Sequence, residues 1–527
     1  MDKLSEFLSE VRNHIGSDNV LDNPDTVKQY EANMTDWKRE VLGVCLPSSR
    51  DDVVSIVIAA NRFNIPLHPI SRGRNWGLGS KLPTLKPSVI VDLKHMNRIH
   101  SINREQHYAV IEPGVTQQQL YDYLKEKNLP FIFNIIGSSS DTSLIGNALE
   151  RGVGYFHSRV EDISGMEIVL GTGKTLKTGF GHYPQSRVTY EYPHGVGPSL
   201  DGLFFQSNFG IVTQAAIALM PMREARGALI CKLKDENRFH TYLQEISELR
   251  KSKVLNTVVH IGNRQRTRTT IEPLLYNYYK NHGYADAVKL AKETFQKEFP
   301  HAWSAIAGIM GSKPEIKHAI KQTKRKLKGI AEVSYVNDRT VALMESIERI
   351  LPVKKSAVLN AIKPLYLLSQ GVPTDAALKS LYWSASDLEQ LDATEPDLSD
   401  CGMIYCLPIC PLSAKSGQVM TTITQDIYLK KYGFDPAITL NTIDDKSIDC
   451  VINILFNKTD PKEAERAQKC MKELHEKMVA EGFIPYRVGL QYMDKIVSQN
   501  EYWKMIRKLK QVFDPNGIIS PGRYNLV

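Results

Sequence analysis

The sequence predicts an α+β fold in which one domain is split around another, and three observations indicate this. Up to Pro221, short strand-like runs alternate with helical patterns and Gly-rich loops. Beyond Pro221 the chain becomes more helical and more charged, and after Gly482 it regains loop motifs rich in Pro, Gly and Arg. A chain of 527 residues, 42% hydrophobic and 24% charged, is long enough for two or three domains with a large buried core.

The first predicted elements surround a Gly-rich loop. Ser49 and Asp52 form a capping-box pattern that opens a helix over Val53–Asn64, and Leu67–Ile70 is a short strand. The loop Pro69–Ser80 follows this strand at once. Later elements are expected as strands at Val89–Leu93 and Ala109–Glu112, a helix from Thr116 to about Asn128, and a hairpin of Met166–Leu170 with Thr175–Thr178.

Composition excludes several classes of protein. The longest apolar runs fall far short of the ~20 residues that a membrane helix needs, and the N-terminus lacks the apolar region of a secretory signal. We therefore expect a cytoplasmic protein that does not associate with membranes. Seven cysteines without a C-x-x-C pair indicate neither a disulfide framework nor a zinc ribbon, and no metal site is predicted.

The net charge and the motifs of the sequence limit the ligands and the enzyme classes that we expect. The net charge of +8 favours anionic ligands, but the densest basic stretch, Lys313–Lys328, has the spacing of a solvated helix face. No nucleic-acid partner is therefore expected. The chain also lacks G-x-G-x-x-G, H-E-x-x-H and nucleophile-elbow motifs, which removes the main sequence support for nicotinamide dehydrogenases, zincins and α/β-hydrolases.

The Gly-rich loop Pro69–Ser80 has the composition of an anion-binding site. Its three glycines allow successive amides to turn inward, and Ser, Arg and Asn side chains add donors suited to a diphosphate. Taken in isolation, an irregular surface turn explains the loop equally well. The candidate binding residues of the loop are Ser71, Arg72, Gly73, Arg74, Asn75, Trp76 and Gly77.

Two further segments carry polar chemistry. The stretch Gly137–Ser143 also follows an apolar strand-like run and precedes Ile145–Ala148 and Arg151–Tyr155, so that the two polar loops could line opposite sides of one long polar cofactor. Near the C-terminus, Tyr486 and Arg487 put a phenol donor beside a permanent cation, a pair that can hold a phenolate or a carboxylate.

These and other motifs succeed one another in a distinctive order. They are Pro69–Ser71 with Gly73–Asn75, Val110–Thr116, Gly146–Tyr155, Ser164–Glu167, Leu200–Phe204, Gln206–Asn208 with Gly210–Thr213, Tyr486–Arg487 and Asp514–Ile519. Each motif is weak alone. In this order they resemble the flavoprotein family of vanillyl-alcohol oxidase and the flavin subunit of p-cresol methylhydroxylase, and the resemblance runs over most of the chain.

The resemblance implies a PCMH-type FAD-binding domain split between residues 1–222 and 483–527, with an α+β cap domain at 223–482 that covers the substrate. FAD would lie extended, with its diphosphate on the two polar loops. Arg523 would face the flavin pyrimidine, where a cation stabilises the charge that builds on reduction. The FAD-binding residues that the resemblance implies are Ser71, Arg72, Gly73, Arg74, Asn75, Trp76, Gly77, Pro113, Gly137, Ser138, Ser139, Ser143, Asn147, Gly152, Tyr155, Ile211, Val212 and Arg523.

The activity that the resemblance implies is that of an FAD-dependent oxidoreductase. It would remove hydride from an aromatic or phenolic alcohol, or from a benzylic carbon, to flavin N5. Tyr486 and Arg487 would hold the phenolate, since a phenol with a pKa of about 10 stays ionised at neutral pH only beside positive charge. Asp449 is a candidate catalytic base, although a plain surface carboxylate is an equal alternative.

The sequence departs from the family around the substrate. Leu78 stands where relatives have a second phenolate-binding tyrosine, and Ser138 stands where they have an aspartate beside flavin N5. Met403 and Glu395 stand at the positions of covalent flavin attachment. Because neither side chain forms those bonds, FAD is expected to be bound non-covalently.

Two other functions stay open. Arg487 could instead anchor a substrate carboxylate, which would give FAD-dependent oxidation or oxidative decarboxylation of a hydroxy or carboxylic acid. A non-catalytic flavin-binding protein would also explain the incomplete phenolate site. The expected partners are a small aromatic or carboxylate substrate, O2 or a redox protein as electron acceptor, and, as is usual among relatives, further copies of the chain in a homo-oligomer.

Overall fold

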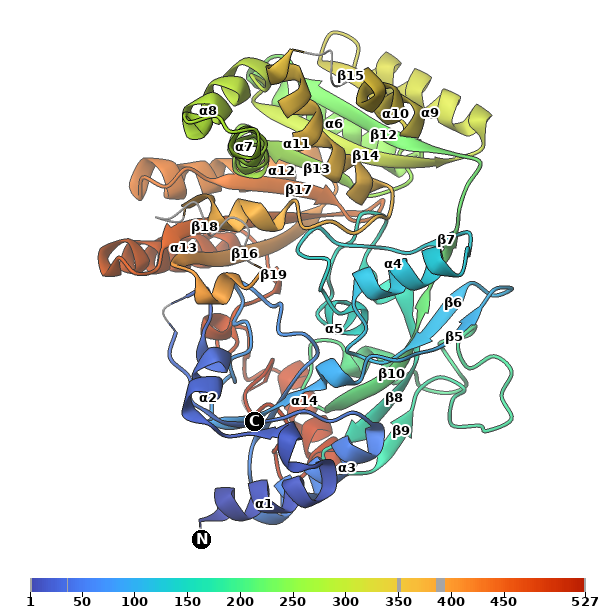
Figure 1. Cartoon of the computed structure of the whole chain (residues 1–527), viewed down its shortest axis with the longest axis vertical. Helices are drawn as coiled ribbons and strands as arrows, with labels where there is room; N and C mark the ends of the chain where they lie inside the picture. The colour runs from blue at the N-terminus through green and yellow to red at the C-terminus, as the bar shows by residue number, and fades with distance from the viewer. Residues whose placement is uncertain (1, 36, 348–351, 385–393, 526–527) are drawn as a thin grey trace.

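The chain forms a four-stranded, a five-stranded and an eight-stranded sheet, with the eight-stranded sheet in the upper half of Figure 1 and the other two in the lower half. The computed structural model describes every residue except 1, 36, 348–351, 385–393 and 526–527. Within those described ranges, no helix combines the length and the apolar character needed to cross a bilayer.

The four-stranded sheet carries the Gly-rich loop. In spatial order its strands are β1 (Val20–Leu21), β2 (Val41–Cys45), β4 (Ser88–Asp92) and β3 (Leu67–Ile70), of which the last three are parallel. Helix α3 (Arg50–Phe63) packs on this sheet and on α1 (Lys3–Ile15), and α2 (Pro24–Glu31) lies against β2. Helix α3 begins earlier than the predicted Val53 because Ser49 and Asp52 cap it reciprocally. The Gly-rich loop leaves the end of β3.

The five-stranded sheet is antiparallel. In spatial order its strands are β5 (Ile99–Asn103), β6 (Tyr108–Ile111), β10 (Gly210–Ala218), β8 (Ile163–Leu170) and β9 (Thr175–Lys177). Beside it lie α4 (Gln117–Glu126), α5 (Leu144–Leu149) and the short pair β7 (Phe131–Ile132) and β11 (Met220–Pro221). Thr116 caps α4 as predicted, and β8 with β9 is the predicted hairpin. Helix α4 ends before Asn128, which has a positive φ of 51° and so leaves the helix.

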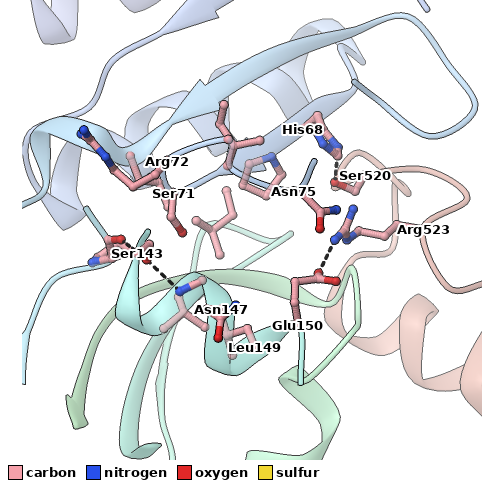
Figure 2. Close-up of a pocket in the computed structure, with 18 of the residues that line it drawn as sticks. His68, Ser71, Arg72, Asn75, Ser143, Asn147, Leu149, Glu150, Ser520 and Arg523 are labelled. Atoms are coloured by element: carbon pink, nitrogen blue, oxygen red, sulfur yellow. Dashed lines mark hydrogen bonds and ion pairs between the residues drawn. The ribbon is translucent and has the colours of Figure 1, made fainter. Parts of the chain in front are cut away.

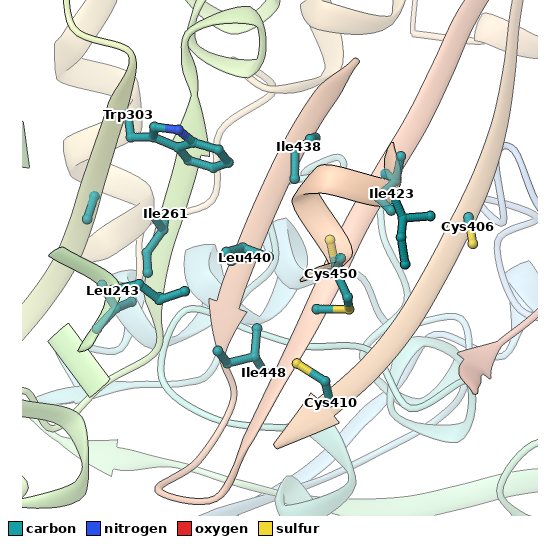
Figure 3. Close-up of a cluster of buried hydrophobic side chains, with 14 of the residues drawn as sticks. Leu243, Ile261, Trp303, Cys406, Cys410, Ile423, Ile438, Leu440, Ile448 and Cys450 are labelled. Atoms are coloured by element: carbon teal, nitrogen blue, oxygen red, sulfur yellow. The ribbon is translucent and has the colours of Figure 1, made fainter. Parts of the chain in front are cut away.

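The eight-stranded antiparallel sheet forms the upper half of the molecule. In spatial order its strands are β15 (Ala331–Val336), β12 (Ala225–Leu233), β14 (Trp303–Gly311), β13 (Val259–Asn263), β17 (Ala437–Thr442), β18 (Ser447–Asn457), β16 (Cys401–Pro411) and β19 (Pro485–Arg487). One face buries a large core, which includes Leu243, Trp303 and Cys450 in Figure 3. This core packs under α6 (Phe239–Lys251), α9 (Lys313–Lys326), α12 (Ala414–Gln425) and α13 (Pro461–Ala480).

The opposite face of this sheet turns towards the functional site. It lies against α7 (Arg264–Asn281) and α11 (Val353–Ser369), α8 (Ala287–Glu298) packs on these two helices, and α10 (Asp338–Ile347) packs beside β12 and α11. Along β16, Met403 and Tyr405 belong to this side, whereas Ile404 and Cys406 belong to the large core, as the alternation of a strand requires.

The carboxyl end of the chain returns to the lower half. After β19, helix α14 (Glu501–Phe513) leads to a C-terminal loop that pairs with β3: Leu67 N donates to Ile518 O and Ser520 N donates to Leu67 O, both at 2.7 Å. A fully buried ion pair between Lys510 and Asp514 fixes this loop. The Lys510 ammonium also donates to the carbonyl oxygens of Asn208 and Ile519.

Candidate active site

A cavity, here called the first cavity, lies between the Gly-rich loop, α5, β10 and the C-terminal loop (Figure 2). Its walls come from segments far apart in the sequence. Of the residues predicted from the sequence, those that line it are Ser71, Arg72, Gly73, Arg74, Asn75, Pro113, Ser143, Asn147, Ile211, Val212 and Arg523. The fold thus brings together residues from both ends of the predicted flavin-binding domain.

Two predicted residues line neither this cavity nor the second one described below. Gly77 has a positive φ of 72°, and a Cβ there would come within 2.8 Å of the Tyr405 ring. Ser139 is buried, and its hydroxyl accepts a hydrogen bond from Asp141 N at 3.1 Å. Both residues support the conformation of the polar loops and do not line a cavity, because their side-chain positions face other protein atoms.

The first cavity has the shape and the donors of an anion site. Ser143 caps α5 by accepting from Gly146 N at 2.9 Å. A Cβ at Gly146 would lie 2.6 Å from Ser71 Oγ, so only glycine lets the helix approach the loop this closely. Arg72 Nε and Asn147 Oδ1 are buried without a hydrogen-bond partner among the described residues. Unsatisfied buried polar atoms are costly, and a polar ligand lying along the cavity would satisfy them.

Acidic side chains hold the arginines of the Gly-rich loop in place. Asp141 accepts from both Arg72 and Arg74, with 2.6 Å to Arg74 Nη2. Arg74 also pairs with Glu395, which lies 3.7 Å from Lys81 Nζ. The Glu395 carboxylate, which the resemblance put at a position of flavin attachment, is therefore engaged in an ion pair.

Glu150 is the central acid of the first cavity, and the sequence analysis did not select it. It pairs with Arg523 (Figure 2). It also lies 3.7 Å from Arg487 Nε and accepts a hydrogen bond from Tyr524 Oη at 3.1 Å. Burial acts to raise the pKa of Glu150, but the Arg523 and Arg487 guanidinium groups hold this pKa below its usual value. The sequence signal that could have identified Glu150 is its position within the Gly146–Tyr155 motif.

His68 is a second residue that sequence reasoning missed. It lies on β3 and lines the first cavity, where its Nδ1 is 3.0 Å from Ser520 Oγ. Burial, together with the charge of Arg523, lowers the pKa of His68 to about 3, so its imidazole is neutral.

A second cavity adjoins the first and shares Arg74, Asn75, Asn147 and Arg487 with it. It extends upward to the eight-stranded sheet. The predicted residues that line it are Trp76, Gly137, Ser138, Gly152, Tyr155, Asp449, Tyr486 and Arg487. The three predicted catalytic residues are therefore brought together in one cavity, next to the residues that it shares with the first.

Several residues with polar side chains in the second cavity were not selected from the sequence. They include His260, Arg266, Tyr405 and Asn441. Leu78 lines the same cavity and cannot donate a hydrogen bond, but Tyr405 supplies a phenol hydroxyl there from β16. Burial raises the pKa of Tyr405, so the group stays protonated. Nothing in the local sequence marks these residues, because each belongs to a strand or helix whose partners lie far along the chain.

Asp449 and Tyr486 form the titratable centre of the second cavity. Asp449 is fully buried on β18, and neither carboxyl oxygen has a hydrogen-bond partner among the described residues. Burial raises the pKa of Asp449 to about 7, although the side chains of Asn441 and Tyr486 lie close enough to oppose this in part. Burial and the charge of Asp449 raise the pKa of Tyr486. Asp449 is thus a buried carboxyl that can exchange a proton near neutral pH, and not a surface carboxylate.

Comparison with known proteins identifies the ligand that such a site takes. Residues 41–179 match the model of an FAD binding domain, and residues 448–524 match the C-terminal domain of FAD linked oxidases. The chain is 29% identical to 1'-carboxy-chondrochloren decarboxylase of Chondromyces crocatus, over 99% of this chain and 97% of that protein. It is 28% identical to the flavoprotein subunit of 4-cresol dehydrogenase [hydroxylating] of Pseudomonas putida, over 99% and 95%.

A solved structure agrees with these relatives. The fold superposes on p-cresol methylhydroxylase with substrate bound at a TM-score of 0.84 and 27% identity, covering 99% of this chain and 97% of that one. The α+β fold, the FAD cofactor and the family resemblance predicted from the sequence are thereby confirmed. The chain therefore carries the FAD binding domain and the C-terminal domain of FAD linked oxidases, is similar over nearly its whole length to p-cresol methylhydroxylase, and is an FAD-dependent oxidoreductase that acts on a small molecule.

Proposed function

We propose that this enzyme oxidises a phenolic or other aromatic alcohol, or a benzylic carbon, bound in the second cavity. The observation that carries the proposal is the convergence of Tyr486, Arg487 and Asp449 in that cavity, beside residues shared with the first. The cresol named in the 4-cresol dehydrogenase relative is a phenol of this type. A cation, a phenol donor and a proton acceptor are the groups that such a substrate requires.

FAD fits the first cavity by its chemistry. The donors of Ser71, Arg72 and Asn75, with the close approach at Gly146, suit a diphosphate, and Arg523 suits the electron-rich ring. When bound, FAD supplies the acceptor for hydride removed from the substrate. We further propose that residues 1–222 and 483–527 hold FAD and that residues 223–482 cover the substrate.

Non-covalent attachment of FAD is part of the same proposal. Met403 lines the second cavity with a thioether, and the Glu395 carboxylate is paired with Arg74. Neither group is the histidine or tyrosine that links flavin in relatives. The electron acceptor, either O2 or a redox protein, assembly into a homo-oligomer, and a cytoplasmic location stay predictions from the sequence.

The residues of the second cavity would hold the substrate as an anion. Arg487 contributes a permanent charge, and Tyr486 contributes a hydroxyl that stays protonated and can donate. Both favour the phenolate over the phenol, whose pKa in water is about 10. Ionised Asp449 would take the phenol proton, which leaves the carboxyl neutral beside the bound anion.

The role of Asp449 predicts a pH dependence. Because its pKa is about 7, the carboxyl is mostly neutral below that pH and ionised above it, so flavin reduction should speed up as pH rises through 7. In Asp449→Asn the rate of flavin reduction should no longer rise with pH, and at pH 8 it should be about 10²-fold lower than in the unmodified enzyme. Anaerobic stopped-flow reduction from pH 5.5 to 9 measures both. If flavin reduction in the variant still speeds up through pH 7, another group is the base.

A substrate panel tests the function itself. Para-alkylphenols and 2-hydroxy acids are each mixed with the yellow enzyme without O2, and flavin bleaching is followed. We expect at least one phenol, and no simple hydroxy acid, to bleach the flavin. Bleaching by acids alone would favour oxidation or oxidative decarboxylation of an acid held by Arg487, an alternative that the decarboxylase relative supports. Tight FAD without bleaching by any compound would indicate a non-catalytic flavin-binding protein.

A further inference from the structure

Arg266 is a cation on the upper wall of the second cavity. It belongs to the first turn of α7, where Asn263 caps the helix by accepting from Arg266 N at 2.9 Å. A Cβ at Gly262 would lie 3.3 Å from Arg266 Cγ, so the aliphatic part of the side chain lies across this glycine of β13. Arg266 lines the second cavity and not the first.

Aromatic and neutral groups surround Arg266. Burial raises the pKa of Tyr155 to about 12 and lowers that of His260 to about 4, and in both cases the Arg266 charge is close enough to act on the group. The rings of Tyr155 and His260 are 4.5 Å apart. His260 Nδ1 lies 2.6 Å from Asn441 Oδ1, and its Nε2 is buried without a hydrogen-bond partner in the described part of the chain. The neutral His260 imidazole cannot neutralise the positive charge of Arg266.

The other arginines of this cavity have carboxylate partners. Arg74 pairs with Asp141 and Glu395, and Arg487 lies 3.7 Å from Glu150. Arg266 has no carboxylate within ion-pair distance among the described residues, although Asp449 lines the same cavity.

The neighbouring arginines of α7 are also engaged. Arg264 lies over the Phe295 ring at 5.8 Å, and Arg268 is 3.5 Å from Asp435. The first turn of α7 has no acidic residue, so the positive end of the helix dipole adds to the charge of Arg266.

We propose that Arg266 binds a carboxylate on the substrate, at the end opposite to the group held by Tyr486 and Arg487. The substrate class is then an aromatic acid: a phenol whose para side chain ends in a carboxylate. Tyr405 lines the same cavity as Arg266 and Arg487, and the charges of both act to lower the pKa of its hydroxyl. An arginine that faces a partly desolvated cavity without a counter-ion gains most from a planar, bidentate anion. The inference rests on the proposed function for the position of the phenol.

Binding to reduced enzyme tests the inference without turnover. The probes are para-hydroxybenzoate, para-hydroxyphenylacetate and para-hydroxyphenylpropionate, each paired with its primary amide, which has nearly the same shape and no charge. Calorimetric titration of the dithionite-reduced holoenzyme gives the Kd of each. At least one acid should bind about 10–100-fold more tightly than its amide, as expected for a charge-assisted hydrogen-bonded pair.

Two variants separate Arg266 from its neighbours. Arg266→Gln should abolish the preference for acid over amide and leave amide affinity within about twofold, whereas Arg268→Gln on the same helix should leave both unchanged. Equal binding of acids and amides by the unmodified enzyme would overturn the inference. Loss of the preference in Arg487→Gln but not in Arg266→Gln would assign the carboxylate to Arg487 instead.

The outcomes also distinguish this inference from the proposed function. If para-alkylphenols bleach the flavin but no acid is preferred, only the role of Arg266 fails. If acids without a phenol bind as well as the phenolic acids and still depend on Arg266, the phenol assignment fails and the carboxylate site stands. If no probe binds and no para-alkylphenol bleaches the flavin, both are wrong.

Discussion

Replacement of Arg487 by alanine is expected to slow anaerobic flavin reduction by about 10²–10³-fold at saturating substrate. Arg487 lines both cavities and contributes the permanent charge beside Tyr486. Without it, the phenolate would lose the permanent charge beside it, and Arg523 of the first cavity is already paired with Glu150. Arg487→Lys keeps the positive charge but loses the planar guanidinium group. Its rate of flavin reduction should therefore lie between those of the unmodified enzyme and Arg487→Ala.

The measurement must separate chemistry from cofactor loss, because Arg487 also borders the cavity proposed for FAD. The reduction rate is therefore measured by stopped flow on enzyme whose flavin content is known from its absorbance ratio. Arg268→Ala, on a helix of the upper half and outside both cavities, serves as the matched control. An Arg487→Ala enzyme with full FAD and a reduction rate within twofold of the unmodified enzyme would contradict the proposed role.

The largest expected effect on stability is that of Lys510→Met. Lys510 is fully buried, pairs with Asp514, and donates to the carbonyl oxygens of Asn208 and Ile519. Its removal leaves the Asp514 carboxylate buried without its cation, which typically costs about 3–5 kcal/mol. The C-terminal loop, which carries Arg523, should loosen, so FAD should also bind more weakly.

Urea unfolding of the purified enzyme and FAD titration of the stripped enzyme test this prediction. The urea midpoint should fall markedly in Lys510→Met, and the apparent Kd for FAD should rise. Lys508→Met, which removes the same charge from an exposed position on the same helix, should change neither. Similar midpoints for the two variants would mean that the buried pair does not hold the loop.

Local patterns predicted the parts of the fold that depend on neighbours in the sequence. The capping box at Ser49 gives α3, Thr116 gives α4, and the turn after Leu170 gives the β8–β9 hairpin. The Gly-rich loop was recognised because glycines and donors lie together in one short segment. In each case the chemistry that decides the structure lies within a few residues.

The rest depends on contacts between distant segments. Glu150 becomes the central acid only because Arg487 and Arg523 reach it from the other end of the chain. Tyr405 and Arg266 line one cavity because the Tyr405 side chain belongs to the face of the eight-stranded sheet on which α7 packs. Strand order and side-chain direction at such positions follow from packing of the whole molecule, which short motifs do not encode.

The position of β19 couples the two halves of the enzyme mechanically. Its Arg487 pairs with Leu407 of the upper sheet, while Gln206 Nε2 of the lower half donates to Tyr486 O at 3.0 Å. Arg487 also lies 3.7 Å from Glu150 and donates to Asn75 Oδ1, and both of these residues belong to the lower half. The cation proposed to hold the substrate anion is therefore fixed from both halves at once, so its position depends on the contact between them.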